Sequence, residues 1–302
     1  MSAFWGLSPF TWCILTILGL SLFGLPIGLS MLGASVFYLL ISGQDMGIAA
    51  EQILNGLTNS YTLLAIPLFL LAGELMSQGG MTDRLLGFCN AVFGRFRGGL
   101  AMTNVASATL MSGISGSAIA DTSALGKVLI PAMIKAGYGR GFSAALTAAA
   151  NVVGPIIPPS ITFLMISVLT NLSPLKLFMA AVIPGVLYAS AIMLVAVVIS
   201  RRRGYPAAEA VNLPGILREF KLAFWALAMP VFLIVGIRTG IFNVTESSAV
   251  AVVYALMVGL FIHRELNWRK IWLALVSSAR GTAVIMIILG GAQVVSWFLA
   301  YE

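Results

Sequence analysis

Residues 98–133 read GGLAMTNVASATLMSGISGSAIADTSALGKVLIPAM, an apolar stretch with a glycine- and serine-rich middle. From Gly98 to Ser112 is about 15 residues, or roughly 22 Å of helix, which is shorter than the roughly 30 Å hydrocarbon core of a bilayer. The tip lies at Ser112–Ser117, and a second arm of similar length returns to Pro131. Basic residues flank both outer ends, which places these ends on the cytoplasmic side. The stretch therefore predicts a re-entrant helical hairpin at about residues 98–133.

The composition predicts a membrane protein. Of the 302 residues, 60% are hydrophobic and only 9% are charged, against roughly 25% charged residues in soluble domains. Backbone groups in the hydrocarbon core must pair within the protein, so a spanning chain forms helices or a closed barrel. Continuous apolar runs favour helices over the alternating pattern of barrel strands. The net charge of +7 then marks cytoplasmic helix ends rather than a nucleic-acid site.

The hairpin tip has residues suited to binding an ion. Glycines free the backbone to turn, and Ser115 and Ser117 supply hydroxyl oxygens. Such a tip can coordinate Na⁺, and the positive end of the returning helix can face an anionic substrate. The alternative is that these small residues only allow helices to approach closely. Two interpretations of Asp121 are equally supported. It is either an ionisable residue with a function, or its negative charge stabilises the positive end of the helix dipole.

A second feature is the segment NVVGPIIPPS at Asn151–Ser160. Its three prolines remove amide donors and push the preceding residues out of the α region, so a helix cannot continue through it. The flanking segments, 142–153 and 161–170, together match one membrane crossing, which favours a discontinuous helix at about 142–170 over a plain loop. The polar side chains placed to line the gap are Asn151, Ser160 and Thr162.

The remaining organisation follows from apolar runs and charge. A linker is predicted at Arg201–Leu213, which separates a first unit, residues 1–200, from residues 222–302. Within the connecting region 201–221, an interfacial helix is expected to begin at Pro214. Asp45–Ser60 is polar enough to be a surface segment. Further helices are expected at 10–23, 27–42, 61–76, 85–96, 177–200, 222–237, 246–263 and 271–297.

Two other function classes are compatible with a helical membrane protein. An intramembrane enzyme is disfavoured because the sequence has no HExxH motif and no Cys/His or aspartyl pair, and its single histidine, His263, lies at a helix edge. An ion channel is the second alternative function, because re-entrant hairpins also build selectivity filters.

The two features and several shorter motifs resemble one family along the whole chain. The motifs are Ile114–Asp121, Ile130–Met133, Gly137-Tyr138, Gly154–Ser160, Ala65–Phe69 and Ala72–Met76. In this order they resemble the large permease subunit of tripartite ATP-independent periplasmic (TRAP) transporters, the DctM-like family. One departure is Val244 before Thr245-Glu246, where the family usually has proline.

The resemblance implies a function. It implies an all-α elevator-type transporter in the bacterial inner membrane, which imports organic acids such as C4-dicarboxylates or sialic acid by Na⁺ symport. The implied partners are a periplasmic binding protein, a small DctQ-like membrane subunit and membrane lipid, with no nucleic acid, no cofactor and no enzyme activity. The substrate-binding candidates are Asn104, Ser117, Asp121, Asn151, Pro158, Ser160 and Thr162. The Na⁺ candidates are Ser112, Ser115, Gly116, Ser117 and Gly154.

The length of the chain qualifies this picture. Transporters of this kind are built from two inverted repeats, each with a hairpin and a broken helix. A first repeat occupies about 200 residues here, and no second Ser/Gly-rich hairpin or Gly-Pro break follows the Arg201 cluster. We therefore expect a member truncated at its C-terminus, with the first repeat complete, the second partial and half of the site present.

Overall fold

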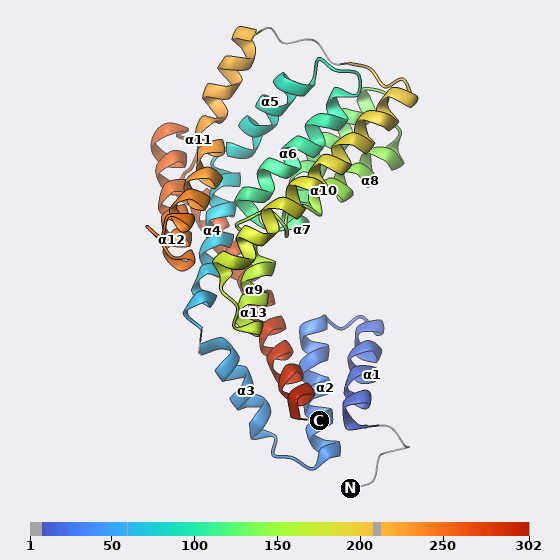
Figure 1. Ribbon diagram of the computed structural model, residues 1–302, viewed down its shortest axis with the longest axis vertical. Helices are drawn as coiled ribbons and strands as arrows, with labels where there is room; N and C mark the ends of the chain where they lie inside the picture. Colours follow the sequence, from blue (N-terminus) through green and yellow to red (C-terminus); the bar gives the residue numbers. More distant parts are fainter. Residues whose placement is uncertain (1–7, 59, 208–212, 302) are drawn as a thin grey trace. The chain divides into compact units, whose positions relative to one another are not determined.

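A computed structural model describes residues 8–58, 60–207 and 213–301 (Figure 1). All regular elements in these ranges are helical, which confirms the all-α prediction. The helices are α1 (Pro9–Leu22), α2 (Ile27–Ser42), α3 (Gly47–Thr58), α4 (Ala65–Gln78), α5 (Met81–Phe93), α6 (Gly99–Ser115), α7 (Ala118–Lys135), α8 (Arg140–Asn151), α9 (Ile161–Thr170), α10 (Pro174–Arg202), α11 (Leu213–Arg238), α12 (Val244–Met257) and α13 (Trp268–Tyr301), with a 3₁₀ turn η2 (Tyr61–Leu64) before α4 and a π-helical turn η3 (Val258–Ile262) after α12.

Several helices suit a bilayer. Among the described residues, five helical stretches are long and apolar enough to cross it. The chain is thus an all-α, multi-pass membrane protein. The five stretches are Tyr61–Gln78, Pro174–Arg202, Leu213–Arg238, Val244–Ile262 and Trp268–Tyr301.

The helical hairpin forms as predicted, with a shorter turn. Helix α6 continues through the expected tip to Ser115 and ends at Gly116, whose φ of 60° is left-handed. The Gly116 N–H donates to the Ser112 carbonyl at 3.2 Å, and Ser117 caps α7. Glycine ends a helix in this conformation without a β-carbon clash, so the turn needs only two residues.

The predicted helix break is also present. Helix α8 ends at Asn151 and α9 begins at Ile161, with turns but no regular helix between them. The intervening Pro155, Pro158 and Pro159 have no amide hydrogen to donate, which prevents the helical ladder from continuing.

The chain divides into two compact units, and α9 and α13 contribute residues to both. Unit 2 comprises Leu64–Ser167 and Leu172–Ser278. In this unit α6 packs against α5, α7, α8 and α10, while α4 packs on α12 and α11 on α5 (Figure 1). Helix α6 can pack against several neighbours at once because small residues such as Ala101 and Ala108 fill its buried surface.

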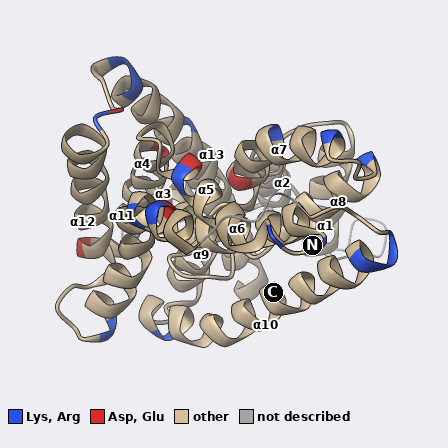
Figure 2. Cartoon of the chain, turned by 90° about the horizontal axis from the view of Figure 1, so that it is seen from above, with Lys and Arg blue, Asp and Glu red and all other residues tan. Residues whose placement is uncertain are grey.

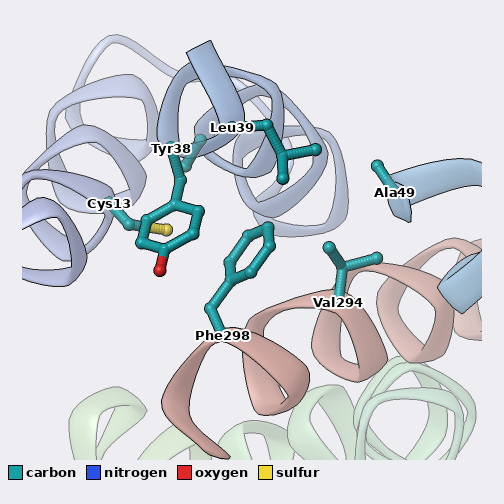
Figure 3. Close-up of a cluster of buried hydrophobic side chains, with 7 residues drawn as sticks. Cys13, Tyr38, Leu39, Ala49, Val294 and Phe298 are labelled. Atoms are coloured by element: carbon teal, nitrogen blue, oxygen red, sulfur yellow. The ribbon is translucent and has the colours of Figure 1, made fainter. Parts of the chain in front are cut away.

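Unit 1 comprises Met1–Leu63, Val168–Asn171 and Ala279–Glu302, described within the ranges given above. Its core joins α1, α2, α3 and the end of α13 (Figure 3). In that core the rings of Tyr38 and Phe298 stack with centroids 4.0 Å apart.

One sequence prediction is refined and one needs correction. The segment 45–60, expected as a polar surface segment, contains helix α3, in which Ala49 is buried and Ile48 and Ile53 pack on the unit 1 core while Glu51 and Asn55 are exposed. The interfacial helix expected from Pro214 is not separate: it continues into the next span as α11. Residues 208–212 of the predicted linker lie outside the described residues.

Candidate functional site

The hairpin tip and the helix break contact each other through their main chains. A β-carbon placed on Gly116 would lie 2.6 Å from the Pro159 carbonyl oxygen and 3.3 Å from the Ile161 nitrogen. On the opposite side of this contact, a β-carbon on Gly154 would lie 3.0 Å from the Ala118 nitrogen. The backbones approach this closely because glycine leaves the space that a side chain would occupy. The two features singled out in the sequence therefore form one structural centre.

A cavity of about 350 Å³ lies beside this centre in unit 2. Its walls come from α4, the start of α5, the hairpin tip, the first turns of α7 and Ser277 of α13. The Ser277 hydroxyl donates to Glu74 Oε1 at 2.8 Å, which connects α13 to α4 at the cavity wall. The polar and charged lining residues are Glu74, Ser77, Thr82, Ser115, Ser117, Asp121, Ser123, Lys127 and Ser277.

Asp121 is the most unusual of these lining residues. Its side chain is buried, with 1% exposure, yet its Oδ2 atom has no hydrogen-bond partner among the described residues. A buried carboxylate oxygen without a donor is costly, and more so at membrane depth. A cation, a proton or a polar ligand in the cavity would remove that cost.

The two tip serines stand beside Asp121 in the cavity wall. Ser115 Oγ accepts a hydrogen bond from the Ser117 N–H at 3.1 Å, and Ser117 Oγ accepts one from the Ala120 N–H at 3.4 Å. Each hydroxyl keeps a second lone pair. The structure thus brings together three of the predicted site residues, Ser115, Ser117 and Asp121, as oxygen donors around one space.

The other predicted Na⁺ candidates lie outside the cavity lining. Ser112 is fully buried, and its hydroxyl donates to the Thr109 carbonyl of its own helix at 2.6 Å. Gly116 and Gly154 make the main-chain contact between the tip and the break.

The substrate-binding candidates in the break are also apart from the cavity. Ser160 is buried, donates to the Pro155 carbonyl at 2.5 Å and accepts from the Phe163 N–H, so it caps α9. Asn151 donates to the Thr147 carbonyl at 2.7 Å, and its Oδ1 is buried without a partner in the described part of the chain. Thr162 is exposed, and Pro158 is buried.

Asn104 lies about three helical turns before the tip. Its side-chain amide donates to Thr147 Oγ1 at 2.7 Å and approaches the Met133 sulfur at 3.5 Å. Asn104 therefore connects α6 to α7 and α8 within the buried bundle and does not line the cavity.

The structure adds cavity residues that the sequence reasoning missed. Ala120, Ser123, Ala124 and Lys127 follow the spacing of one helix face along α7, so this wall could have been found from periodicity. Lys127 is the single basic residue among the lining residues. No local pattern indicates Ser277, because its partner Glu74 lies 203 residues earlier.

Comparison with known proteins assigns the family. A family model described as the tripartite ATP-independent periplasmic transporter, DctM component, matches residues 14–302. The chain is 38% identical, over 91% of its length, to the 2,3-diketo-L-gulonate TRAP transporter large permease protein YiaN of Escherichia coli, of which the match covers 65%. It is 36% identical, over 88% of its length, to the sialic acid TRAP transporter permease protein SiaT of Haemophilus influenzae, of which the match covers 43%.

A third relative agrees with these two. The chain is 38% identical, over 80% of its length, to the C4-dicarboxylate TRAP transporter large permease protein DctM of Pseudomonas aeruginosa, of which the match covers 57%. The chain thus spans less than two thirds of the length of each of these three relatives. The motif order, the helical hairpin, the helix break and the family match agree, and the chain belongs to the DctM component family of TRAP transporters.

Proposed function

We propose that the chain is the large membrane subunit of a Na⁺-coupled secondary transporter for organic acids. The relatives are named for 2,3-diketo-L-gulonate, sialic acid and C4-dicarboxylates, all of which carry a carboxylate. By the same family membership, the chain works in the bacterial inner membrane with a small DctQ-like subunit and a periplasmic binding protein. The relatives' names as transporter permeases also argue against an enzyme.

The observation that carries the proposal is the cavity at the hairpin tip. Asp121 supplies a buried carboxylate oxygen without a partner in the described structure, and Ser115 and Ser117 add hydroxyl oxygens. Oxygen donors at a broken or re-entrant helix are the usual ligands of coupling Na⁺. In the proposal Na⁺ binds between these three side chains.

The substrate carboxylate would bind to the positively charged groups of the same cavity. The amino-terminal end of α7 lines the cavity, and amide groups at such an end favour an anion. Lys127, further along α7, provides the positive side chain. The bound cation and the substrate carboxylate would also attract each other across the same cavity.

We further propose an elevator architecture built from inverted repeats, with residues 1–200 as the first repeat and 222–302 as part of the second. In such an architecture each unit would combine helices from both halves of the chain. Helix α4 of the first half packs along α12 of the second in unit 2. In unit 1, α13 of the second half supplies Val294 and Phe298 to the core formed with α1 and α2.

Uptake by the complete transporter tests the function. Membrane vesicles that hold the full-length subunit, its small partner and the binding protein are supplied with radiolabelled succinate or sialic acid. We expect saturable accumulation that requires both a Na⁺ gradient and the binding protein. Current without the binding protein would instead identify a channel.

Two variants test the proposed cation site. Asp121→Asn and Ser117→Ala should raise the Na⁺ concentration for half-maximal uptake, roughly tenfold for Asp121→Asn, because a charged ligand is lost. Asp83→Asn is the matched control, since Asp83 is exposed in the first turn of α5 and does not line the cavity. Unchanged Na⁺ dependence in both variants would remove the hairpin tip from the cation site.

A further inference from the structure

An apolar groove runs between α6 and α10 on the outside of unit 2. Its volume is about 760 Å³, and its walls include Val105 and Leu110 of α6 and Met193 and Val197 of α10. Along α10 the groove extends from Val186 to Arg201, which is roughly 22 Å of helix. This length exceeds the thickness of one leaflet, about half of a roughly 30 Å hydrocarbon core.

The hydroxyl groups in the groove walls are hydrogen-bonded within their own helices. The Thr109 hydroxyl donates to the Val105 carbonyl at 2.8 Å, and the Ser190 hydroxyl donates to the Val186 carbonyl at 2.7 Å. Both lining hydroxyls therefore satisfy their hydrogen bonds within their own helices. Among the lining residues, the single charged side chain is Arg201 at one end.

Further basic residues gather at that end of the groove. Arg202 and Arg203 follow Arg201, and the loop that carries Arg95 and Arg97 lies beside them. The two segments touch, because the N–H of residue 98 in that loop donates to the carbonyl of residue 206 at 3.2 Å. Figure 2 shows Lys and Arg gathered at the outer loops beside α8 and the end of α10.

Within this cluster the guanidinium of Arg201 forms no salt bridge or cation–π contact with the described residues. Arg203 lies over the Phe142 ring, and Arg95 lies over a neighbouring phenylalanine ring. Arg201 is exposed, and no carboxylate pairs with it in the part of the chain that the structure describes. Among the described residues, this positive group at the mouth of an apolar groove has no carboxylate partner.

We propose that this groove binds an anionic phospholipid, with one acyl chain between α6 and α10 and the phosphate at Arg201. Basic pockets beside membrane helices recognise anionic headgroups in this way. A zwitterionic lipid could fill the groove, but its headgroup carries no net charge and would be attracted less strongly to the basic cluster. A soluble anion would gain nothing from an apolar groove of this length.

Native mass spectrometry of the complete transporter tests the proposal, with phosphatidylglycerol and phosphatidylcholine as probes. The wild-type protein should retain phosphatidylglycerol more tightly than phosphatidylcholine. Arg201→Gln should weaken that retention roughly fivefold, the effect of one basic residue at a membrane surface. Arg218→Gln, which changes an exposed arginine of α11 outside the groove, should leave it unchanged.

A second pair of variants tests the acyl-chain site. Ala189→Phe fills the groove and should lower retention of both lipids, whereas Ala191→Phe makes the same substitution on an exposed face of α10 outside the groove. Equal retention of phosphatidylglycerol by Arg201→Gln and Arg218→Gln would overturn the proposal. So would a Ser190→Cys crosslink to the small subunit combined with no lipid retention, because the groove would then be a subunit contact.

Discussion

Replacing Gly116 with alanine is the most direct test of the contact between the hairpin tip and the helix break. The substitution adds one methyl group to a residue with a left-handed φ of 60°. That methyl group would lie 2.6 Å from the Pro159 carbonyl oxygen, a distance that real β-carbons do not reach. Because the neighbour is main chain, it cannot move aside by changing rotamer.

The size of the effect follows from two contributions. The left-handed conformation costs a residue with a β-carbon about 1–2 kcal/mol. Displacing the packed main chain of the break is an overpacking effect of about 1–3 kcal/mol. Gly116→Ala should therefore lose about 2–5 kcal/mol of stability.

Other glycines separate the two contributions. Gly137 has a φ of 89° with no atom near the added methyl group, so Gly137→Ala should lose only about 1–2 kcal/mol. Gly141→Ala, in α8 with open space and no left-handed φ, is the control that carries neither cost and should raise stability slightly. Gly154→Ala adds a close contact to the Ala118 nitrogen without left-handed strain, and tests the other side of the same contact.

The assay combines thermal unfolding in detergent with Na⁺-dependent uptake. We expect Gly116→Ala to unfold at the lowest temperature of the four variants and to lose uptake, while Gly137→Ala and Gly141→Ala transport normally. If Gly116→Ala matches Gly137→Ala in both measurements, the tip and the break do not depend on each other as the structure indicates.

Two further predictions concern packing. Asn104→Ala removes the 2.7 Å hydrogen bond to Thr147 and should lower the free energy of unfolding by about 1 kcal/mol. It should not change the Na⁺ concentration for half-maximal uptake. A rise in that concentration would show that Asn104 belongs to the site. Phe298→Ala empties a fully buried position stacked on Tyr38 and should cost about 3 kcal/mol, whereas Leu299→Ala, at a 63% exposed position, should be near neutral in thermal unfolding.

The hairpin and the break could be predicted because local chemistry determines both. Gly116 ends α6 through its own backbone freedom, and Pro155, Pro158 and Pro159 prevent a helical ladder wherever they occur. Helix α3 was missed because Glu51 and its polar neighbours hide a narrow apolar face in the sequence. Whether such a surface segment forms a packed helix then depends on a partner far along the chain.

The cavity was only partly predictable for a related reason. Ser112, Ser115 and Ser160 look alike in the sequence, yet the Ser112 and Ser160 hydroxyls bond to nearby carbonyls and only Ser115 lines the cavity. The side of the cavity formed by Glu74 and Ser277 depends on tertiary packing between α4 and α13. Residue type identifies a possible ligand, but the position of the side chain in the folded chain decides whether it reaches the cavity.

The contact between the tip and the break also shows how one short turn combines two roles. Because main-chain atoms make that contact, it requires only that Gly116 and Gly154 lack side chains. Ser115 and Ser117, on either side of Gly116, line the cavity and also accept hydrogen bonds from the backbone of the turn. The backbone contact and the oxygen atoms of the cavity wall are therefore supplied by different residues of one short turn.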